Sequence, residues 1–355
     1  MNIYYSKIAQ VGSGLTNQIF CLITSIIIAN SKKQKIVIID DLQNDYLLNT
    51  KSSIDSILNM TEMNFFLKKY NITIFDKNNI NFKVTKVLYG NNNDFVDLTN
   101  IIISKFYDKN SLFIDKNTHF NNLIYDPCVG VLKYIYIHYK INNYEFIDCF
   151  DENLKEHIVF DLTKADFSLT FGWINSLSQV IFDDIISNII FNDKYINISN
   201  DFIIKNNILS SKINIIHLRL EDDAIKHWAK MNNMTESYYK DFIECKYINI
   251  IKKYIDKNDK NIILTYKNNN NVTKFMIDND YKVQFINKYS DGRELNAIVD
   301  FVISKNCNNI FIGNFNIEVL NGSTFSYLIL KNLNKDIKKI LIDLDRIKND
   351  EYVFV

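Results

Sequence analysis

The chain has 355 residues, 47% of them hydrophobic and 14% aromatic, which is enough to build two globular domains with cores of their own. Its 41 basic and 41 acidic side chains give a formal net charge of zero, which argues against a nucleic-acid-binding protein, since such proteins need a basic surface. Five scattered cysteines without a Cys-x-x-Cys pair, and five histidines without metal-ligand spacing, predict neither a disulfide frame nor a metal site.

The most apolar early run, residues 19–29, is too short to cross a bilayer, which takes about 20 residues. It also lacks the basic stretch that opens a secretory signal peptide. We therefore expect a cytoplasmic protein without a membrane span.

The first forty residues predict a β-α-β unit. An apolar strand over 3–11 leads into the turn Gly12-Ser13-Gly14, an apolar helix follows to about residue 30, and a second strand covers 35–40. Glycines at such a turn let the backbone approach a ligand, and the helix start presents N–H groups to an anion. The third glycine of the dinucleotide-binding fingerprint is absent, however, and a tight turn without a ligand explains Gly12 and Gly14 equally well.

Residues 50–160 have a weaker pattern. We expect helix within 52–70 and strands at 71–75, 82–88 and 112–114, whereas 134–139 fits either a strand or a core helix. Apolar residues at helical spacing between 180 and 190 predict a further helix. We place the domain boundary just before it, which gives an N-terminal domain over 1–172 and a C-terminal domain over 173–355.

The second half alternates regularly between strands and helices. Strands are predicted at 213–219, 261–266, 282–286, 309–312 and 339–343, helices at 235–255, 271–278, 294–306 and from about 323, and a polar loop between 219 and 235. Repeated β-then-α units indicate a parallel sheet with helices on both faces. The sequence therefore predicts an α/β protein of two Rossmann-like domains that face each other across a cleft.

The strand that begins at Ile213 ends in charged residues. His217, Arg219, Glu221, Asp222 and Asp223 follow its apolar start, and they would lie at the carboxyl edge of the sheet, where α/β proteins bind ligands. A guanidinium at that edge suits a phosphate or a carboxylate, although a surface cluster of ion pairs remains the alternative. The turn over 323–326 opens a late helix, and it fits either an anion site or a plain helix cap.

Three separate segments resemble the GDP-fucose-dependent fucosyltransferases, which include α-1,2-, α-1,6- and protein O-fucosyltransferases. The stretch 12–18, Gly-Ser-Gly-Leu-Thr-Asn-Gln, resembles the family's Gly-Gly-Leu/Phe-x-Asn-Gln opening, and 217–223, His-Leu-Arg-Leu-Glu-Asp-Asp, resembles its His-x-Arg-x-x-Asp segment. The second segment is closest to the His-Leu-Arg-Phe-Glu-x-Asp form of plant-type O-fucosyltransferase-like proteins. The third segment combines Asp300 with the Ser-Thr-Phe-Ser turn at 323–326.

The resemblance implies the GT-B architecture and a metal-independent enzyme without a cofactor, which transfers fucose from GDP-fucose to a glycan or glycoprotein with inversion. Arg219 would hold the β-phosphate, and His217 and Asp300 would contact the guanosine half. The remaining donor contacts implied by the resemblance are Ser323, Thr324, Phe325 and Ser326 at the pyrophosphate, and Gly12, Gly14 and Asn17 along the cleft.

Inversion also calls for a base that takes the proton of the acceptor hydroxyl. Glu221, Asp222 and Asp223 lie nearest to Arg219 in sequence, although one of them is expected to pair with Arg219 and fix its geometry. Asp40 and Asp41, at the end of a strand in the first domain, are rival bases.

The sequence also departs from the family pattern. The Arg-Arg pair of the α-1,2 and α-1,6 enzymes is Arg219-Leu220 here, and Ser13 interrupts the opening glycines. Two alternatives therefore stay open: a GT-B transferase that uses another nucleotide sugar, and a catalytically silent protein that binds glycans or has a structural role.

Overall fold

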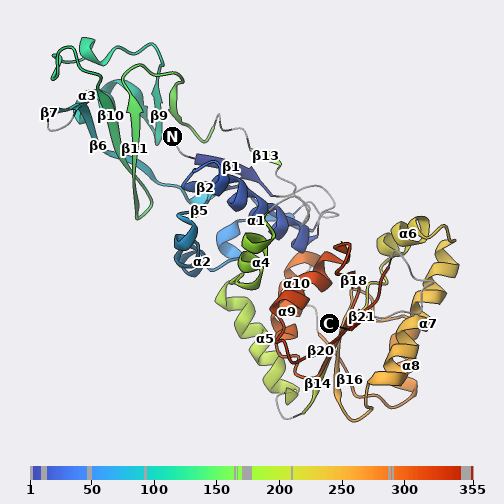
Figure 1. The fold of residues 1–355 in the computed structure, drawn as a ribbon. Helices are drawn as coiled ribbons and strands as arrows, with labels where there is room; N and C mark the ends of the chain where they lie inside the picture. Colours follow the sequence, from blue (N-terminus) through green and yellow to red (C-terminus); the bar gives the residue numbers. More distant parts are fainter. Residues whose placement is uncertain are drawn as a thin grey trace.

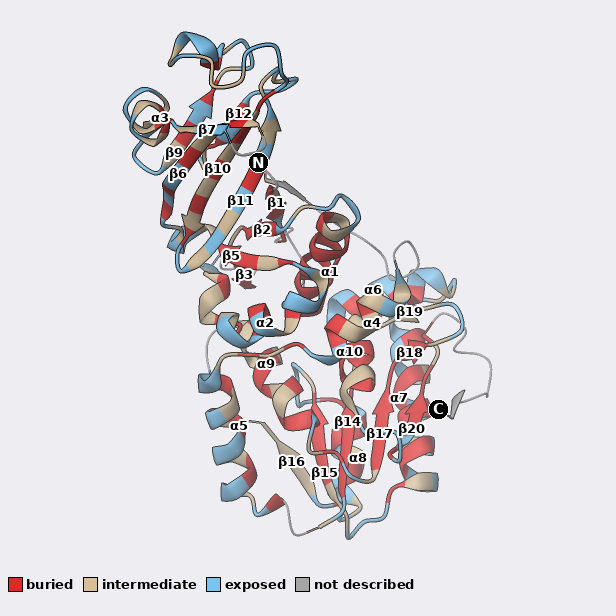
Figure 2. Ribbon diagram, turned by 60° about the vertical axis from the view of Figure 1, so that its left-hand side comes forward, coloured by how far each residue is buried: buried red, intermediate tan, exposed pale blue. Residues whose placement is uncertain are grey.

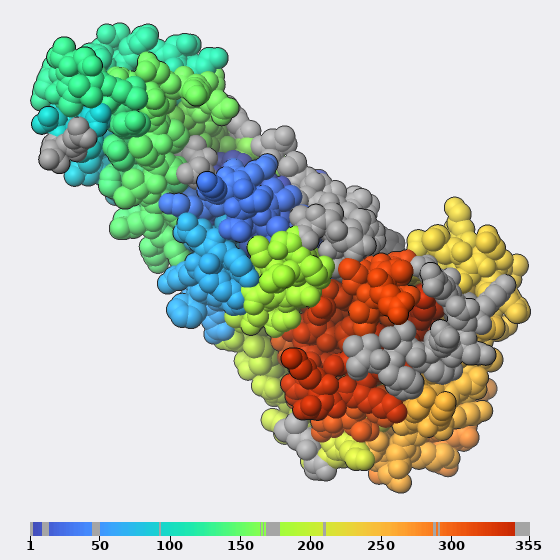
Figure 3. Space-filling model, viewed as in Figure 1, coloured from blue at the N-terminus to red at the C-terminus, as the bar shows by residue number. Residues whose placement is uncertain are grey.

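The computed structural model describes residues 3–8, 14–45, 50–91, 94–163, 165, 167–169, 178–208, 211–286, 289, 292–344 and 353–354. They form an elongated α/β molecule (Figure 3) with antiparallel sheets at one end, a parallel sheet in the middle and a second parallel sheet at the other end (Figure 1). This confirms the predicted fold class. Among the described residues, no helix is both long and apolar enough to cross a membrane.

The middle sheet is parallel, with the strand order β13-β1-β2-β5. Its elements are β1 (Ile3–Lys7), β2 (Ile36–Ile39), β5 (Thr73–Asp76) and β13 (Ser168–Leu169), with the helices α1 (Leu15–Ser31) and α2 (Met60–Leu67). The side chains of β2 alternate between two cores: Ile36 and Ile38 pack toward the antiparallel sheets, whereas Val37 and Ile39 pack toward α1. This sheet is therefore covered on both faces.

Residues 82–160 form the antiparallel end of the molecule. A four-stranded sheet has the order β11-β10-β6-β7, and a three-stranded sheet has the order β12-β9-β8. The elements here are β6 (Phe82–Asn91), β7 (Asp94–Asp97), α3 (Thr99–Phe106), β8 (Tyr107–Asp108), β9 (Ser111–Ile114), β10 (Tyr134–Ile141), β11 (Tyr144–Asp151) and β12 (Ile158–Phe160). The stretch 134–139, which fitted a strand or a helix, is a strand with every second side chain buried. In the sequence, a short ribbon of β3 (Leu42–Asp45) and β4 (Thr50–Ser52) lies between β2 and β5 of the middle sheet.

The C-terminal sheet has the order β16-β15-β14-β17-β20-β21 and is parallel except at β21. Its strands are β14 (Ile213–His217), β15 (Lys260–Leu264), β16 (Val283–Phe285), β17 (Ile310–Gly313), β20 (Lys338–Leu341) and β21 (Val353–Phe354). The chain builds outward from β14 through β15 to β16, and then returns to the other side of β14 to form β17. In an open α/β sheet such a reversal opens a crevice at the carboxyl ends of the strands, here at the ends of β14 and β17.

Helices cover both faces of the C-terminal sheet (Figure 1 and Figure 2). Ile213 and Ile215 share a core with α5, α9 and α10, whereas Ile216 and Leu218 share a core with α6, α7 and α8. The helices of this half are α4 (Gln179–Ser187), α5 (Asp193–Lys205), α6 (Asp222–Met231), α7 (Glu236–Tyr254), α8 (Asn271–Asp278), α9 (Arg293–Ser304) and α10 (Thr324–Asn332). A small ribbon, β18 (Phe315–Asn316) with β19 (Asn321–Gly322), precedes α10.

Two local predictions in this half are wrong. The strand predicted over 213–219 ends at His217, and the predicted polar loop holds α6. This helix buries Ala224, Ile225, Trp228 and Ala229 on one face, and Asp222 and Asp223 form its first turn, where acidic side chains favour a helix start. The predicted domain boundary at 172/173 lies outside the described residues.

Candidate active site

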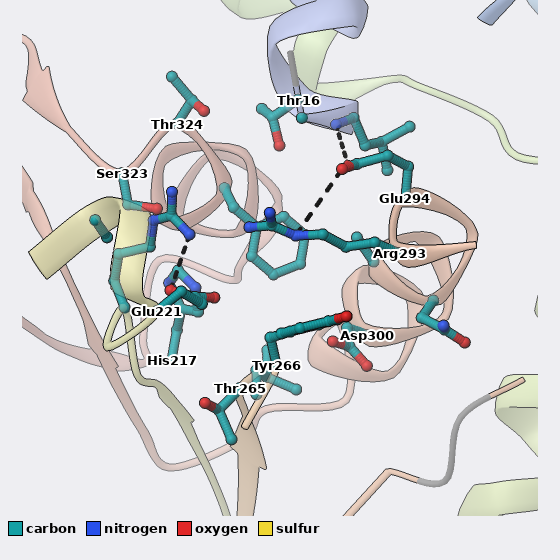
Figure 4. Close-up of a pocket in the computed structure, with 18 of the residues that line it drawn as sticks. Thr16, His217, Glu221, Thr265, Tyr266, Arg293, Glu294, Asp300, Ser323 and Thr324 are labelled. Carbon is teal, nitrogen blue, oxygen red and sulfur yellow. Dashed lines mark hydrogen bonds and ion pairs between the residues drawn. The ribbon is translucent and has the colours of Figure 1, made fainter. Parts of the chain in front are cut away.

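A cavity of about 510 Å³ opens where the two halves meet (Figure 4). The start of α1 lines it from the N-terminal half, and the ends of β14 and β15 with the starts of α6, α9 and α10 line it from the C-terminal half. Of the residues predicted from the sequence, those that line the cavity are Gly14, Asn17, His217, Arg219, Glu221, Asp223, Asp300, Ser323, Thr324 and Phe325. The structure thus brings together residues from both ends of the chain, although Gly12 lies outside the described residues.

Arg219 lies two residues beyond β14 and is held by two carboxylates. Its Nη1 lies 2.8 Å from Glu221 Oε2, and its Nη2 donates a hydrogen bond of 3.2 Å to Asp223 Oδ2. Burial would lower the pKa of Arg219, but these two carboxylates outweigh burial and raise it. Arg219 is therefore a permanent cation with a fixed orientation at the cavity wall.

Two buried polar side chains, Tyr247 and Asn314, form hydrogen bonds with the backbone at the end of β14. Tyr247 Oη lies 2.8 Å from the carbonyl oxygen of His217 and 2.6 Å from Asn314 Oδ1, and it accepts the Arg219 N–H at 3.3 Å. Asn314 Nδ2 donates to the same His217 carbonyl at 3.0 Å. Burial raises the pKa of Tyr247, so its hydroxyl stays protonated. These contacts fix the backbone that carries Arg219.

His217 is buried beside the cavity and is neutral. Its Nδ1 lies 2.7 Å from Ser326 Oγ, which also accepts the backbone N–H of Asn314 at 2.9 Å. We assign the hydroxyl proton of Ser326 to the contact with Nδ1 and the ring proton of His217 to Nε2. Burial, and then the charge of Arg219, lower the pKa of His217 to about 3. His217 thus acts as a neutral hydrogen-bond donor.

This arrangement also locates Ser326, which is fully buried and does not line the cavity. It was expected to contact the donor directly, and here it lies behind His217. Phe325 packs edge-on against the His217 ring, with 5.2 Å between the ring centroids. The start of α10 and the end of β14 therefore support each other.

The start of α10 presents backbone N–H groups to the cavity. Ser323 is the N-cap, and its hydroxyl oxygen accepts the N–H of Ser326 at 3.5 Å. The N–H groups of Thr324 and Phe325 belong to the first turn, where no helix carbonyl precedes them. Gly322 adopts φ +130°, and a side chain there would meet the backbone of Asn314 and Phe315, so the approach to this turn requires glycine. Such a helix start favours an anion.

Asp300 lies on α9 and faces the cavity (Figure 4). Its carboxyl group forms no hydrogen bond or ion pair with any residue in the described part of the chain. Burial raises the pKa of its carboxyl to about 7. This side chain is therefore available to a ligand that offers hydrogen-bond donors.

The start of α1 brings Gly14, Thr16 and Asn17 to the opposite wall. Gly14 is the N-cap and supplies no side-chain oxygen, and the carboxylate of Glu294 on α9 accepts the N–H of Leu15 instead. The helix start that was expected to offer its N–H groups to a ligand therefore already binds a carboxylate of the other half. The same contact joins the two halves beside the cavity.

Sequence reasoning missed several residues of the cavity wall, above all Arg293, Glu294 and Tyr266. Tyr266 follows β15, so the rule that singled out Arg219, a polar residue just after a buried strand, also applies to it. Arg293 begins α9, and a basic residue is unfavourable at a helix start, which was a readable signal. Thr16, His227 and Trp228 also line the cavity.

Three carboxylates proposed as bases do not line the cavity. Asp222 is exposed and pairs with Lys267 at 2.6 Å, a contact that lowers the pKa of Asp222. Asp40 and Asp41, at the end of β2, both pair with Lys77. Within the described ranges, no group of three or more His, Cys, Asp or Glu side chains could hold a metal ion.

Comparison with solved structures gives a likeness in fold. No family model matches this sequence, and no curated protein matches it. The crystal structure of POFUT1, a protein O-fucosyltransferase, in complex with GDP-fucose matches with a TM-score of 0.50 at 9% identity, over 93% of each chain. The apo form of POFUT1 matches with a TM-score of 0.47 at the same identity and coverage. The chain therefore has a GT-B-like α/β fold similar to that of a protein solved with GDP-fucose.

Proposed function

We propose that this chain is an inverting glycosyltransferase that transfers fucose from GDP-fucose to a hydroxyl group of a glycan or protein acceptor. The observation that carries the proposal is the convergence of Arg219, the start of α10 and Asp300 on one cavity between the two halves. The GT-B-like fold and the three sequence motifs support it further.

The diphosphate would lie between Arg219 and the start of α10. A guanidinium forms two parallel hydrogen bonds with phosphate oxygens, and the N–H groups of Thr324 and Phe325 add donors from a second direction. As the bond from the sugar carbon to the diphosphate oxygen breaks, its electron pair stays on the leaving diphosphate. Donors already fixed in place stabilise this growing negative charge without rearranging.

The guanine base would lie on the Asp300 side of the cavity. Guanine presents two adjacent N–H groups, which one carboxylate accepts together. The apolar side chains of Ile286, Ala297 and Val299 line the same cavity and would contact the base. His217, with its proton on Nε2, would donate to an oxygen of the donor nucleotide.

The acceptor hydroxyl would attack the sugar carbon from the face opposite the diphosphate and pass its proton to a carboxylate. Of the three carboxylates that follow Arg219 in the sequence, Glu221 and Asp223 line the cavity. The side chain of Glu221 is 11% exposed and that of Asp223 is 51% exposed, so we assign the positioning of Arg219 to Glu221 and the proton transfer to Asp223. We also propose that the reaction needs no metal, because Arg219 and the start of α10 supply the charge stabilisation themselves.

The decisive experiment is transfer from GDP-fucose by the Arg219→Lys variant, with folding checked by circular dichroism. Lysine keeps the charge but cannot form the two parallel hydrogen bonds of a guanidinium. We therefore expect a loss of activity of at least a hundredfold with an unchanged fold. Wild-type activity in this variant would refute the role of Arg219. Activity should also survive EDTA, and a loss restored by Mg²⁺ would refute metal independence.

The nucleotide is tested separately by thermal shift with GDP, UDP and CMP. Because a ligand that binds only the native state raises the melting temperature, we expect a clear shift with GDP and little with the other two. A larger shift with UDP or CMP would identify a transferase for another nucleotide sugar. Tight GDP binding without hydrolysis or transfer in any acceptor screen would indicate a catalytically silent protein.

A further inference from the structure

The charges that line the cavity are poorly suited to a diphosphate if Arg219 acts alone. The acidic side chains at the wall are Glu221, Asp223, Glu294 and Asp300, and the basic ones are Arg219 and Arg293. Arg219 is already paired with two of these carboxylates, at 2.8 and 3.2 Å. A diphosphate brings further negative charge, so the site needs a second cation close to the first.

Arg293 is the second Lys or Arg side chain that the described residues bring to this cavity. Its guanidinium lies over the ring of Tyr266, with 5.4 Å from Cζ to the ring centroid, and such stacking fixes the plane of the group. Figure 4 shows its side chain extending from the start of α9 across the cavity, toward the side where Ser323 and Glu221 lie. The side chain is 23% exposed, about as much as that of Arg219 at 24%.

The position of Arg293 is unfavourable for the helix that carries it. Arg293 is the first residue of α9, where the partial positive charge of the helix N-terminus repels a cation. Arg293 Nε lies 4.0 Å from Oε1 of its neighbour Glu294, and the other oxygen of Glu294 accepts the Leu15 N–H. A cation held at an unfavourable place in a ligand cavity is typical of a functional residue.

We propose that Arg293 binds the diphosphate of the nucleotide sugar together with Arg219, and so supplies from α9 the second cation that the Arg219-Leu220 segment lacks. This inference rests on the proposed function. When the bond between the sugar carbon and the diphosphate oxygen breaks, Arg293 would share the negative charge that remains on the leaving group. It would therefore contribute more to the transition state than to the bound donor.

The test compares Arg293→Met and Arg293→Lys with the wild type by titration calorimetry with GDP, GMP and guanosine. Loss of a charged contact to phosphate should weaken GDP binding about 10- to 100-fold, GMP binding less, and guanosine binding less than threefold. The GDP affinity of Arg293→Lys should lie between those of the wild type and Arg293→Met, because lysine keeps the charge but not the planar guanidinium group. Lys226→Met, an exposed cation of α6 that does not line the cavity, is the matched control and should bind GDP like the wild type.

Kinetics with GDP-fucose supply the second readout. For Arg293→Met we expect kcat to fall more than KM rises, because the lost contact is strongest in the transition state. Equal losses of GDP and guanosine affinity would show a structural role and overturn the inference, as would wild-type GDP binding in Arg293→Met. In both cases the proposed function stands if Arg219→Lys still abolishes transfer, whereas a wild-type protein that does not bind GDP overturns both proposals.

Discussion

Burial sets the protonation states of two side chains at the cavity wall, His217 and Asp300. Burial and the nearby Arg219 keep His217 neutral, with a pKa of about 3, and burial raises the pKa of Asp300 to about 7. The first shift creates a neutral donor beside the proposed phosphate site. The second creates a carboxyl group whose charge changes within the physiological pH range, so ligand binding by Asp300 should depend on pH.

We expect GDP to bind about tenfold more tightly at pH 8 than at pH 6, because only the ionised Asp300 carboxylate accepts both guanine N–H groups. Calorimetry across this range measures the effect. Asp300→Asn should bind GDP about 10- to 100-fold more weakly at pH 8, and any pH dependence that remains belongs to the phosphate of GDP itself. An identical pH profile in wild type and variant would contradict the assignment.

Asp300→Asn is expected to weaken GDP binding but to stabilise the folded protein. The pKa of Asp300 rises from 3.8 in the unfolded chain to about 7 in the native state, so its favourable contribution is present below pH 4 and is lost as the pH rises toward 7. Asp300→Asn should therefore raise the free energy of unfolding at pH 8, by up to about 4 kcal/mol and by less where water reaches the carboxylate. Urea unfolding at pH 4 and pH 8 measures the difference, which should be absent at pH 4.

Ser326 is predicted to act through His217. Ser326→Ala removes the partner of His217 Nδ1 and of the Asn314 N–H, which should lower the free energy of unfolding by about 1–3 kcal/mol. The freed ring can also change its tautomer, so the imidazole NMR signals of His217 should change and GDP affinity should fall. Ser323→Ala, which removes the helix cap but not this contact, is the control and should leave the His217 signals in place.

At the scale of elements, the start of α9 joins the two halves of the molecule. Glu294 accepts the N–H of Leu15 and takes the place of the side-chain cap that Gly14 cannot supply. This contact lies beside the cavity, so the start of α1 and the start of α9 are held together where the donor is proposed to bind.

Glu294→Ala should lower the free energy of unfolding by about 0.5–2 kcal/mol, because it leaves the buried Leu15 N–H without a partner. Hydrogen exchange of the Leu15 amide should accelerate as well. Glu236→Ala changes a first-turn acid of α7 that is exposed, and it is expected to have a smaller effect. Unchanged exchange at Leu15 would show that Glu294 is not its cap.

Most elements of the C-terminal half could be predicted, because the apolar runs are short, regular and separated by polar turns. The helix predicted at 271–278 is observed with these bounds, and the helix predicted at 235–255 is observed as Glu236–Tyr254 with Thr235 as its N-cap. Helix α6 was missed because its first turn is charged and its apolar face is narrow, and charges next to a strand end look like a loop. Asp222 and Asp223, which were predicted either to act as a base or to pair with Arg219, thus also form the first turn of a helix.

At the scale of the whole molecule, one continuous core connects the halves. Leu15 and Phe20 of α1, Phe182 of α4, and Ile215 and Tyr327 of the C-terminal half belong to the same buried cluster. Tyr70 and Lys69 also contact Asp184 of α4, and Lys331 of α10 pairs with Asp183 at 2.8 Å. The cavity is therefore built on packed helices rather than between loosely joined domains.

Because the site is formed by contacts between the two halves, the sequence could predict only part of it. Arg219 and the turn at Ser323 were found because local pattern places them at a strand end and at a helix start, whereas Asp300 was found through the resemblance of its segment to a family motif. Glu294 was missed because its role depends on a contact with Leu15 at a sequence separation of 279, which no local pattern encodes. At the antiparallel end, the strands predicted at 82–88 and 112–114 are observed as β6 and β9, whereas 134–139 stayed open because tyrosine and isoleucine fit strand and helix alike.

A crystal structure with GDP tests the central claim most directly. We predict that the diphosphate lies within hydrogen-bonding distance of the Arg219 guanidinium and of the N–H groups of Thr324 and Phe325, with the guanine edge against Asp300. GDP bound elsewhere on the molecule, or an empty cavity at saturating GDP, would contradict this claim.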